Sequence, residues 1–438
     1  RHTVEITAVT ARGAIHRATG QLQVCAAARD AEVRWQAPLD GHALHAAPVV
    51  ADGRVFLAAV DLDDGRSGAI DAFDAATGAR LWQHPTAAPV RNAVAVAAGV
   101  LVAATTRGEI LALEVADGSI RWRRDLGAGL DPKSAALFAA PTIADGAVYV
   151  GVQRRFVALD LASGAPRWSV DPLGRDGAWS GSFAAAAVGG GLVIATLERD
   201  RAGVIAFDAA TGAERWRFTG AAAIAVNATP LIDDGAVYLV AGSTEVARLE
   251  LATGAPIWTT RLHGDGFDWG YANAGAPALA GTTLLVPTMY GALVALDRTS
   301  GAERWRFRGG GESVVHPTHY QARTAAFAGA VAVAGETVWA GGADGWLYGV
   351  DIGSGALRGR RDLHAPLLGG VTIAGDRLYV ASYDGMLHAL AVRRGGRRDL
   401  LDALVALAIG AAAGLVIAVM ISRLGRRLEG SRSRWPRS

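Results

Sequence analysis

The chain contains one cysteine and has no surplus of positive charge over most of its length. Cys25 alone permits neither a disulfide within the chain nor a cysteine-based metal cluster. The 392 residues before Arg393 carry 33 basic and 38 acidic residues, so the body of the protein is mildly acidic. Domains that bind nucleic acid are expected to be basic, and we therefore expect no nucleic-acid partner.

A ten-residue phrase recurs through the sequence. It consists of an apolar residue, Asp or Glu, two variable residues, Thr, Ser or Asp followed by Gly, and a Trp four residues after the Gly. The phrase ends at Trp82, Trp122, Trp168, Trp216, Trp258 and Trp305, and a degenerate copy has Gly359 in place of the Trp. Trp35 stands without the preceding phrase. Successive copies are 40 to 54 residues apart, which is the length of one four-stranded propeller blade.

The chemistry of the phrase is structural. We expect each Gly to take a positive φ in a hairpin turn, and each preceding Asp, such as Asp74 or Asp160, to accept hydrogen bonds from the turn amides. Each Trp begins an outer strand and is expected to pack between neighbouring blades. Burial of one such ring stabilises the fold by roughly 3 kcal/mol or more.

Counting the blades gives eight. Inner strands are predicted to begin near Pro48, Ala93, Pro141, Ala184, Pro230, Pro277, Ala328 and Val371. The strands of the eighth blade run directly into Arg393, so this blade has no outer strand that follows in sequence. The segment 31–35, which contains Trp35, supplies its outer strand. The sequence therefore predicts an all-β, eight-bladed propeller of four-stranded blades, closed by an N-terminal strand that removes exposed sheet edges.

The repeated phrase resembles that of the pyrroloquinoline-quinone (PQQ) propellers over about residues 30–396. That superfamily includes quinoprotein alcohol dehydrogenases, the propeller lipoprotein of the bacterial outer-membrane assembly machine, and sensor propellers on receptor kinases. The resemblance implies the fold, and fold alone does not select the function. The quinoprotein enzymes use Ca²⁺, PQQ and a disulfide of adjacent cysteines, which this chain cannot form with one cysteine. Its blades are also close to the minimal length.

Four long polar loops follow outer strands, at 127–138, 172–183, 263–275 and 308–326, and are expected on one face around the central channel. The candidate binding residues near this face are His45, Trp179, Asp268, Trp269, Asn273, His316 and His319. They are binding candidates only: no catalytic residue is predicted, and neither a GxSxG nor an HExxH motif occurs.

Two sets of candidate residues, one in the loop 263–275 and one made of loop histidines, could hold a metal ion. Asp268 and Asn273 offer oxygen ligands for Ca²⁺, although their spacing matches no dedicated Ca²⁺ loop and ordinary Asx-turns are the alternative. His316 and His319 are three residues apart, as are His42 and His45, but the sequence shows no third ligand. For the histidines, the alternative is that they are solvated loop residues. For the whole chain, we expect that no cofactor binds, and the alternative is that it binds PQQ and Ca²⁺.

Residues 403–421 are nineteen uncharged, mostly apolar residues, a length that spans a bilayer as a helix. Four arginines precede this segment and six follow it, which favours a cytoplasmic tail and an extracytoplasmic propeller. Gly410 and Gly414 form a small-xxx-small pair through which two such helices could dimerise.

The predicted organisation has five parts. Residues 1–29 form the end of an upstream β-sandwich or an edge hairpin, 30–396 the propeller, 397–402 a basic linker, 403–421 a transmembrane helix and 422–438 a basic tail. The predicted function is a membrane-anchored scaffold that binds protein or cell-envelope components. The alternatives are a PQQ-dependent quinoprotein oxidoreductase, which would make the chain an enzyme, and a ligand-sensing module.

Overall fold

The computed structural model describes residues 2–9, 15–22, 31–60, 67–127, 139–152, 155–172, 184–197, 203–219, 228–241, 245–262, 275–289, 291–310 and 326–392. The chain divides into two units, Arg1–Val392 and Arg393–Ser438, and the described residues lie in the first. Strands β1 (His2–Val9) and β2 (Ile15–Leu22) pair antiparallel as a separate two-stranded sheet.

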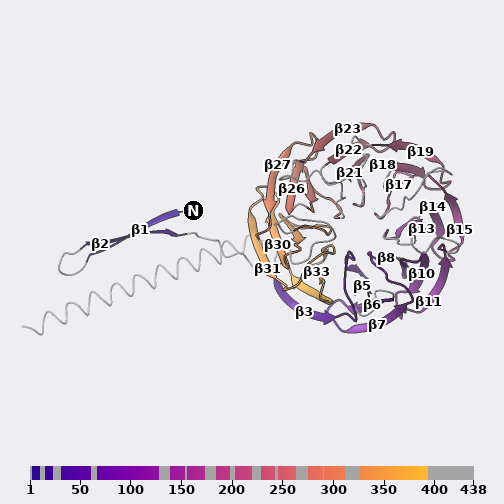
Figure 1. Ribbon diagram of the computed structural model, residues 1–438, viewed down its shortest axis with the longest axis horizontal. Coiled ribbons are helices and arrows are strands. Elements are labelled where there is room, and N and C mark those ends of the chain that lie inside the picture. The colour runs from indigo at the N-terminus through magenta and orange to yellow at the C-terminus, as the bar shows by residue number, and fades with distance from the viewer. Residues whose placement is uncertain are drawn as a thin grey trace, which may run out of the picture. The chain divides into compact units, whose positions relative to one another are not determined.

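The residues described from Ala31 to Val392 form eight four-stranded antiparallel sheets arranged in a ring (Figure 1). Blade 1 contains β4 (Val49–Ala51), β5 (Arg54–Val60), β6 (Gly68–Asp74) and β7 (Arg80–Thr86). Blade 2 contains β8 (Ala95–Ala97), β9 (Val100–Ala104), β10 (Glu109–Glu114) and β11 (Ile120–Asp125). Blade 3 contains β12 (Thr142–Ala144), β13 (Ala147–Val152), β14 (Arg155–Asp160) and β15 (Pro166–Val170). Blade 4 contains β16 (Ala187–Gly189), β17 (Leu192–Leu197), β18 (Gly203–Asp208) and β19 (Glu214–Phe218).

The second half of the ring repeats this order. Blade 5 contains β20 (Leu231–Asp233), β21 (Ala236–Ala241), β22 (Glu245–Glu250) and β23 (Pro256–Arg261). Blade 6 contains β24 (Ala278–Ala280), β25 (Thr283–Pro287), β26 (Ala292–Asp297) and β27 (Glu303–Arg308). Blade 7 contains β28 (Ala332–Ala334), β29 (Thr337–Gly341), β30 (Trp346–Asp351) and β31 (Leu357–Asp362). Blade 8 contains β32 (Thr372–Ala374), β33 (Arg377–Ser382) and β34 (Met386–Ala391), with β3 (Glu32–Pro38) as its outer strand.

Blade 8 joins the two ends of the propeller segment. Strand β3 pairs antiparallel with β34, so that Glu32 lies opposite Ala391 and Trp35 opposite Ala389. In Figure 1 the indigo strand β3 completes the blade whose other strands are orange to yellow. The expected closure by an N-terminal strand and the eight-bladed fold are therefore confirmed.

Burial follows the position of each strand in its blade. The second and third strands are apolar and almost wholly buried, as in β5 and β6, because neighbouring blades cover both faces of each sheet. All residues of the three-residue inner strands are partly exposed around the centre of the ring. The outer strands are mostly exposed: in β11 only the repeat tryptophan, Trp122, is buried.

Asp-Gly turns join several inner strands to second strands. Asp52 and Gly53 take φ values of 49° and 70°, and Asp145 and Gly146 take 49° and 68°. Two successive positive φ values define a type I′ hairpin turn, for which Asp-Gly is a preferred sequence. These turns fix the register of the inner hairpins and lie at the end of each blade opposite the start of its first strand.

The predicted transmembrane helix 403–421, with Gly410 and Gly414, lies outside the described residues. Within the described residues, no helix has the length and apolar character needed to cross a membrane.

Candidate functional site

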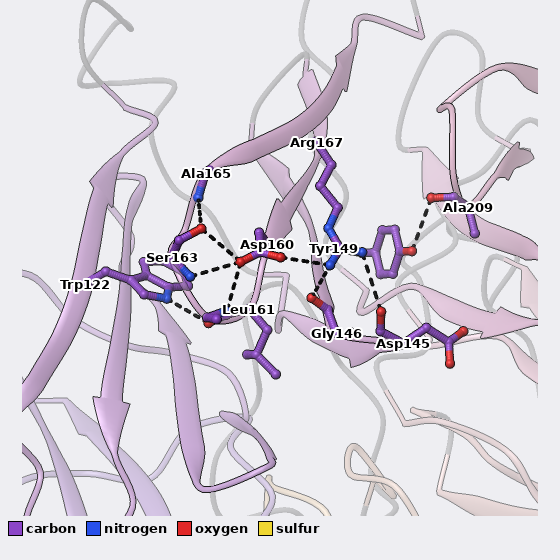
Figure 2. Close-up of polar contacts among 11 residues, drawn as sticks. Trp122, Asp145, Gly146, Tyr149, Asp160, Leu161, Ser163, Ala165, Arg167 and Ala209 are labelled. Atoms are coloured by element: carbon purple, nitrogen blue, oxygen red, sulfur yellow. Dashed lines mark hydrogen bonds and ion pairs between the residues drawn. The ribbon is translucent and has the colours of Figure 1, made fainter.

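The recurring phrase forms the same corner in several blades, and Figure 2 shows the corner of blade 3. One carboxylate oxygen of Asp160, Oδ1, accepts hydrogen bonds from the backbone N–H and hydroxyl of Ser163, at 3.0 and 2.9 Å. The other oxygen, Oδ2, accepts from Arg167 Nη2 at 2.9 Å. Arg167 and Ser163 together lower the pKa of Asp160 to about 2. This carboxylate is therefore ionised and engaged in the turn, not available for acid–base chemistry at neutral pH.

The Trp of one blade docks on the turn of the next. Trp122 donates its indole N–H to the carbonyl of Leu161 at 2.8 Å (Figure 2). Its ring lies against Gly164, where a Cβ atom would be 2.6 Å from the nearest ring carbon. Gly164 has a φ of +66°, so both its conformation and its close contact require glycine.

The same contact recurs at seven junctions within the described residues. The docked pairs are Trp35 with Gly78, Trp82 with Gly118, Trp122 with Gly164, Trp168 with Gly212, Trp216 with Gly254, Trp258 with Gly301, and Trp305 with Gly355. In each pair the indole N–H also donates to a backbone carbonyl of that turn, at 2.8 to 3.2 Å.

The junction between blades 7 and 8 differs, because the outer strand of blade 8 comes from the N-terminal side and no turn links it to β34. Gly359 stands where the Trp would be and lies opposite Gly349. Gly349 in turn lies opposite Trp339 of the second strand, whose ring would be 2.9 Å from a Cβ atom on Gly349. Trp339 is 6% exposed and packs with Ala31, Leu378 and Val392 of blade 8. Sequence reasoning missed Trp339, which stands in an ordinary apolar strand.

A cluster of charged and polar side chains joins blade 8 to blade 1, on the side of blade 8 that faces away from blade 7. Arg80 Nη1 and Gln83 Nε2 donate to Asp40 Oδ2 at 2.9 and 2.8 Å. Asp71 is fully buried beneath them and contacts Arg80 Nε at 3.1 Å and Gln83 Nε2 at 2.9 Å. Burial raises the pKa of Asp71 to about 6, against the opposing effect of Arg80. A perturbed carboxylate often marks a functional site, but this one lies inside the closing junction.

A Ser, a His and an Asp also meet inside blade 8. Gln36 Nε2 donates to His388 Nδ1 at 2.8 Å, so the neutral imidazole carries its proton on Nε2. That N–H donates to Ser382 Oγ at 2.8 Å, and the Ser382 hydroxyl donates to Asp384 Oδ1 at 2.5 Å. The order of donors is opposite to that of a nucleophilic triad, in which the Ser donates to the His. Ser382 is fully buried and His388 is 2% exposed, so these residues stabilise the blade and do not reach a substrate.

The connections that follow second and fourth strands lie at one end of the blades, because strand direction alternates. We call this end the loop face; within the described residues it includes 39–48, 87–94, 105–108, 342–345, 363–371 and 383–385. His42 stacks on Tyr383 with ring centroids 4.5 Å apart, and its Nδ1 donates to the Tyr383 carbonyl at 2.6 Å. This contact joins the loop 39–48 to blade 8.

The predicted binding residue His45 lies on the loop face, in 39–48. Its Nδ1 is buried and has no hydrogen-bond partner among the described residues. Burial lowers the pKa of His45, and the nearby Arg91 lowers it further. The other predicted binding residues, Trp179, Asp268, Trp269, Asn273, His316 and His319, lie outside the described residues, so their meeting with His45 remains a prediction.

The described residues do not assemble a site for PQQ and Ca²⁺. They contain no group of three or more His, Cys, Asp or Glu side chains able to hold a metal ion. The eight inner strands, all of them described, contain one carboxylate, Asp233, and it is ion-paired with Arg298. Asp268 and Asn273, on which such a site would depend, lie outside the described residues.

Two curated bacterial proteins named outer membrane protein assembly factor BamB are similar to this chain. The protein of Xanthomonas campestris pv. campestris is 28% identical over 285 residues, 59% of this chain and 62% of that protein. The protein of Shewanella oneidensis is 27% identical over 298 residues, 63% of this chain and 70% of that protein. The chain thus spans about three-fifths of the Xanthomonas protein.

Solved structures share the fold. BamB from Moraxella catarrhalis superposes with a TM-score of 0.63 at 19% identity, over 83% of this chain and 98% of that chain. Quinohemoprotein alcohol dehydrogenase from Comamonas testosteroni gives 0.68 at 14% identity, over 86% and 78%. At these identities the likeness shows the fold alone and does not distinguish the enzyme from the assembly factor.

A family model described as outer membrane protein assembly factor BamB matches residues 66–273, 153–306, 242–340 and 321–398. These overlapping matches cover more than half of the chain, and all but the last few residues of them lie within the propeller segment. The chain therefore belongs to this family of PQQ-like β-propellers.

Proposed function

We propose that this chain is a non-catalytic scaffold whose propeller binds a protein or cell-envelope partner outside the cytoplasm, tethered by the segment 403–421. The observation that carries the proposal is the family match over residues 66–398, since the relatives are named as an outer membrane protein assembly factor. A protein with that role acts by holding other proteins, and a rigid ring of blades with loops at one end suits it.

The chemistry of the ring supports a scaffold. Side chains that resemble catalytic groups are used to hold blades together: Asp160 in its turn, Asp71 in the closing junction, and Ser382 with His388 inside blade 8. On the described parts of the loop face, contacts of His42 with Tyr383 and of Asp40 with Arg80 and Gln83 hold the loop 39–48 in place. Such a surface provides recognition without a reacting group.

The propeller segment ends away from the loop face. β34 is a third strand, so it ends at the end of the blade opposite the loop face, where Val392 N–H donates to the Asp376 carbonyl at 2.8 Å. The segment proposed to cross the membrane follows this point in the sequence. The described part of the chain therefore ends at the end of blade 8 that does not carry the loop face.

Photocrosslinking tests the proposal. A photoreactive amino acid at Arg107, exposed on the loop face, is expected to give a discrete adduct with an envelope protein in cells that express the full chain. The matched control carries the same amino acid at Asp234, whose side chain is 85% exposed in a turn at the opposite end of the blades. Equal labelling from both positions, or adducts with cytoplasmic proteins, would contradict the proposal.

A further inference from the structure

The outer strand of each blade is a sheet edge, and an unprotected edge can pair with a strand from another protein. Four of these strands include a proline, which has no N–H to donate to an added strand. They are β3, β7, β15 and β23, with Pro38, Pro85, Pro166 and Pro256. The other four, β11, β19, β27 and β31, carry two or three arginines each. Charge is the second way in which natural edges are protected.

In two of these four strands, carboxylates of the same blade pair with two arginines each. In β19, Arg215 pairs with Asp208 at 2.7 Å and Arg217 with Glu214 at 3.0 Å. In β27, Arg304 pairs with Asp297 at 2.5 Å and Arg306 with Glu303 at 2.8 Å. These ion pairs reduce the net charge that the two edges present to an approaching strand.

β11 and β31 share the pattern apolar-Arg-x-Arg-Arg-Asp but differ in what their last arginine contacts. Arg124 of β11 donates to the carbonyls of Gly164 and Ser163, at 2.8 and 3.2 Å, in the turn of blade 3. Its counterpart in β31, Arg361, has no such turn to contact, because blade 8 lacks one. Arg361 is exposed and forms no ion pair among the described residues.

The uncompensated charge of β31 lies on two of its three arginines, since Arg358 is ion-paired with Glu336 and Asp351. Arg360 is exposed and is held 4.3 Å above the ring of Trp346, a contact that fixes its guanidinium without neutralising it. Leu357 is 43% exposed at the start of the strand. Asp362 contacts His364 instead of the two arginines: its Oδ1 accepts from the His364 N–H at 2.8 Å and lies 3.4 Å from His364 Nδ1. Gly359 adds no side chain to the middle of the edge.

We propose that the outer edge of β31 binds an extended acidic segment of a partner protein by strand addition, with carboxylates on Arg360 and Arg361. This inference rests on the proposed scaffold function and names one surface through which the propeller holds a partner. Backbone hydrogen bonds supply the pairing, and the two cations select an acidic strand over a neutral or basic one.

A fluorescent peptide with two adjacent glutamates among valines tests the inference, because Arg360 and Arg361 are adjacent and point to opposite faces of the strand. It is titrated with the full-length chain and followed by anisotropy. We expect saturable binding that Arg361→Glu weakens by about tenfold or more, because it replaces an attraction with a repulsion. Arg123→Glu is the matched control, since Arg123 is exposed on the β11 edge of the same sequence pattern. We expect this control to bind like the wild type.

An N-methylated version of the same peptide distinguishes strand addition from binding by charge attraction alone. N-methylation of alternate residues keeps every carboxylate but removes the donors that pair with an edge. We expect it to bind about tenfold more weakly. Equal binding of the methylated peptide, equal effects of Arg123→Glu and Arg361→Glu, or no binding to the wild type would each overturn the inference. If the Arg107 crosslink forms in any of these cases, the scaffold function stands and only the site at β31 is wrong.

Discussion

Trp35 contacts Gly78 across the point where the propeller closes. A Cβ atom on Gly78 would lie 2.6 Å from the indole ring, and the Trp35 N–H donates to the Ala75 carbonyl at 3.2 Å. This pair joins the N-terminal outer strand of blade 8 to the turn of blade 1. The same Trp–Gly contact occurs at six other junctions between blades among the described residues. The junction that closes the ring is therefore held by the same contact as the junctions between consecutive blades.

The turn glycines provide a test of this docking. We expect Gly164→Ala to lower the free energy of unfolding by about 3 kcal/mol or more, because it adds a clash with the Trp122 ring to the cost of a positive φ. Gly53→Ala is the control, since Gly53 has a φ of 70° and nothing within 4 Å of the added Cβ. That control should cost about 1–2 kcal/mol. Urea denaturation measures both; equal losses would show that the Trp contact adds nothing.

The relocated tryptophan of blade 7 provides a second test. We expect Gly359→Trp, which restores the repeat consensus, to destabilise the protein by about 1–3 kcal/mol, since Trp339 already fills this space over Gly349. Combining it with Trp339→Leu should recover part of the loss. A stabilising Gly359→Trp in thermal unfolding would show that the space at this junction is open.

His388 makes stability depend on pH. Burial lowers its pKa to about 4, from 6.5 in the unfolded chain. Between these values the unfolded chain binds more protons, so stability contributed by the neutral imidazole is present above pH 6.5 and is lost as pH falls toward 4, by about 3 kcal/mol. His388→Gln should remove this loss. Denaturation midpoints at several pH values check it; an unchanged slope in the variant would contradict the assignment.

Asp71 changes the pH dependence of stability in the direction opposite to His388. Burial raises its pKa to about 6 from 3.8, so between these values the folded protein binds more protons. Its contribution is therefore largest at low pH and is lost as pH rises through 6, by about 3 kcal/mol. We expect Asp71→Asn to steepen the rise of stability from pH 4 to 6, because the effect of His388 is then unopposed. A flatter profile in Asp71→Asn would refute this.

The repeat phrase predicted the propeller because its geometry is local. The Gly turn, the Asp that caps it and the Trp that follows lie within ten residues, and the spacing of copies sets the number of blades. Trp35 without a phrase and Gly359 in place of Trp were both visible in the sequence. One topological fact explains them, since blade 8 has an outer strand but no turn.

The contacts that sequence reasoning missed join distant residues. Gln36 and His388 are 352 residues apart, and Asp40 and Arg80 are 40 apart on different blades. Neither pair forms a motif, and Trp339 looks like any residue of a buried strand. Most of the predicted binding residues, such as Asp268 and His316, belong to long loops between blades, where no repeat constrains the backbone and the sequence pattern carries no geometry.

The expectation that PQQ does not bind to the propeller can be checked directly. We expect no saturable quenching of Trp fluorescence when the full chain is titrated with PQQ and Ca²⁺, because the carboxylate of the inner strands, Asp233, is paired with Arg298. Chelation of Ca²⁺ is the control for nonspecific absorption by the quinone. Saturable, Ca²⁺-dependent quenching that is lost in Asp268→Ala and Asn273→Ala would instead assign the propeller to the quinoproteins. The scaffold proposal would then fail, because the loop face would hold a redox cofactor where a partner is proposed to bind.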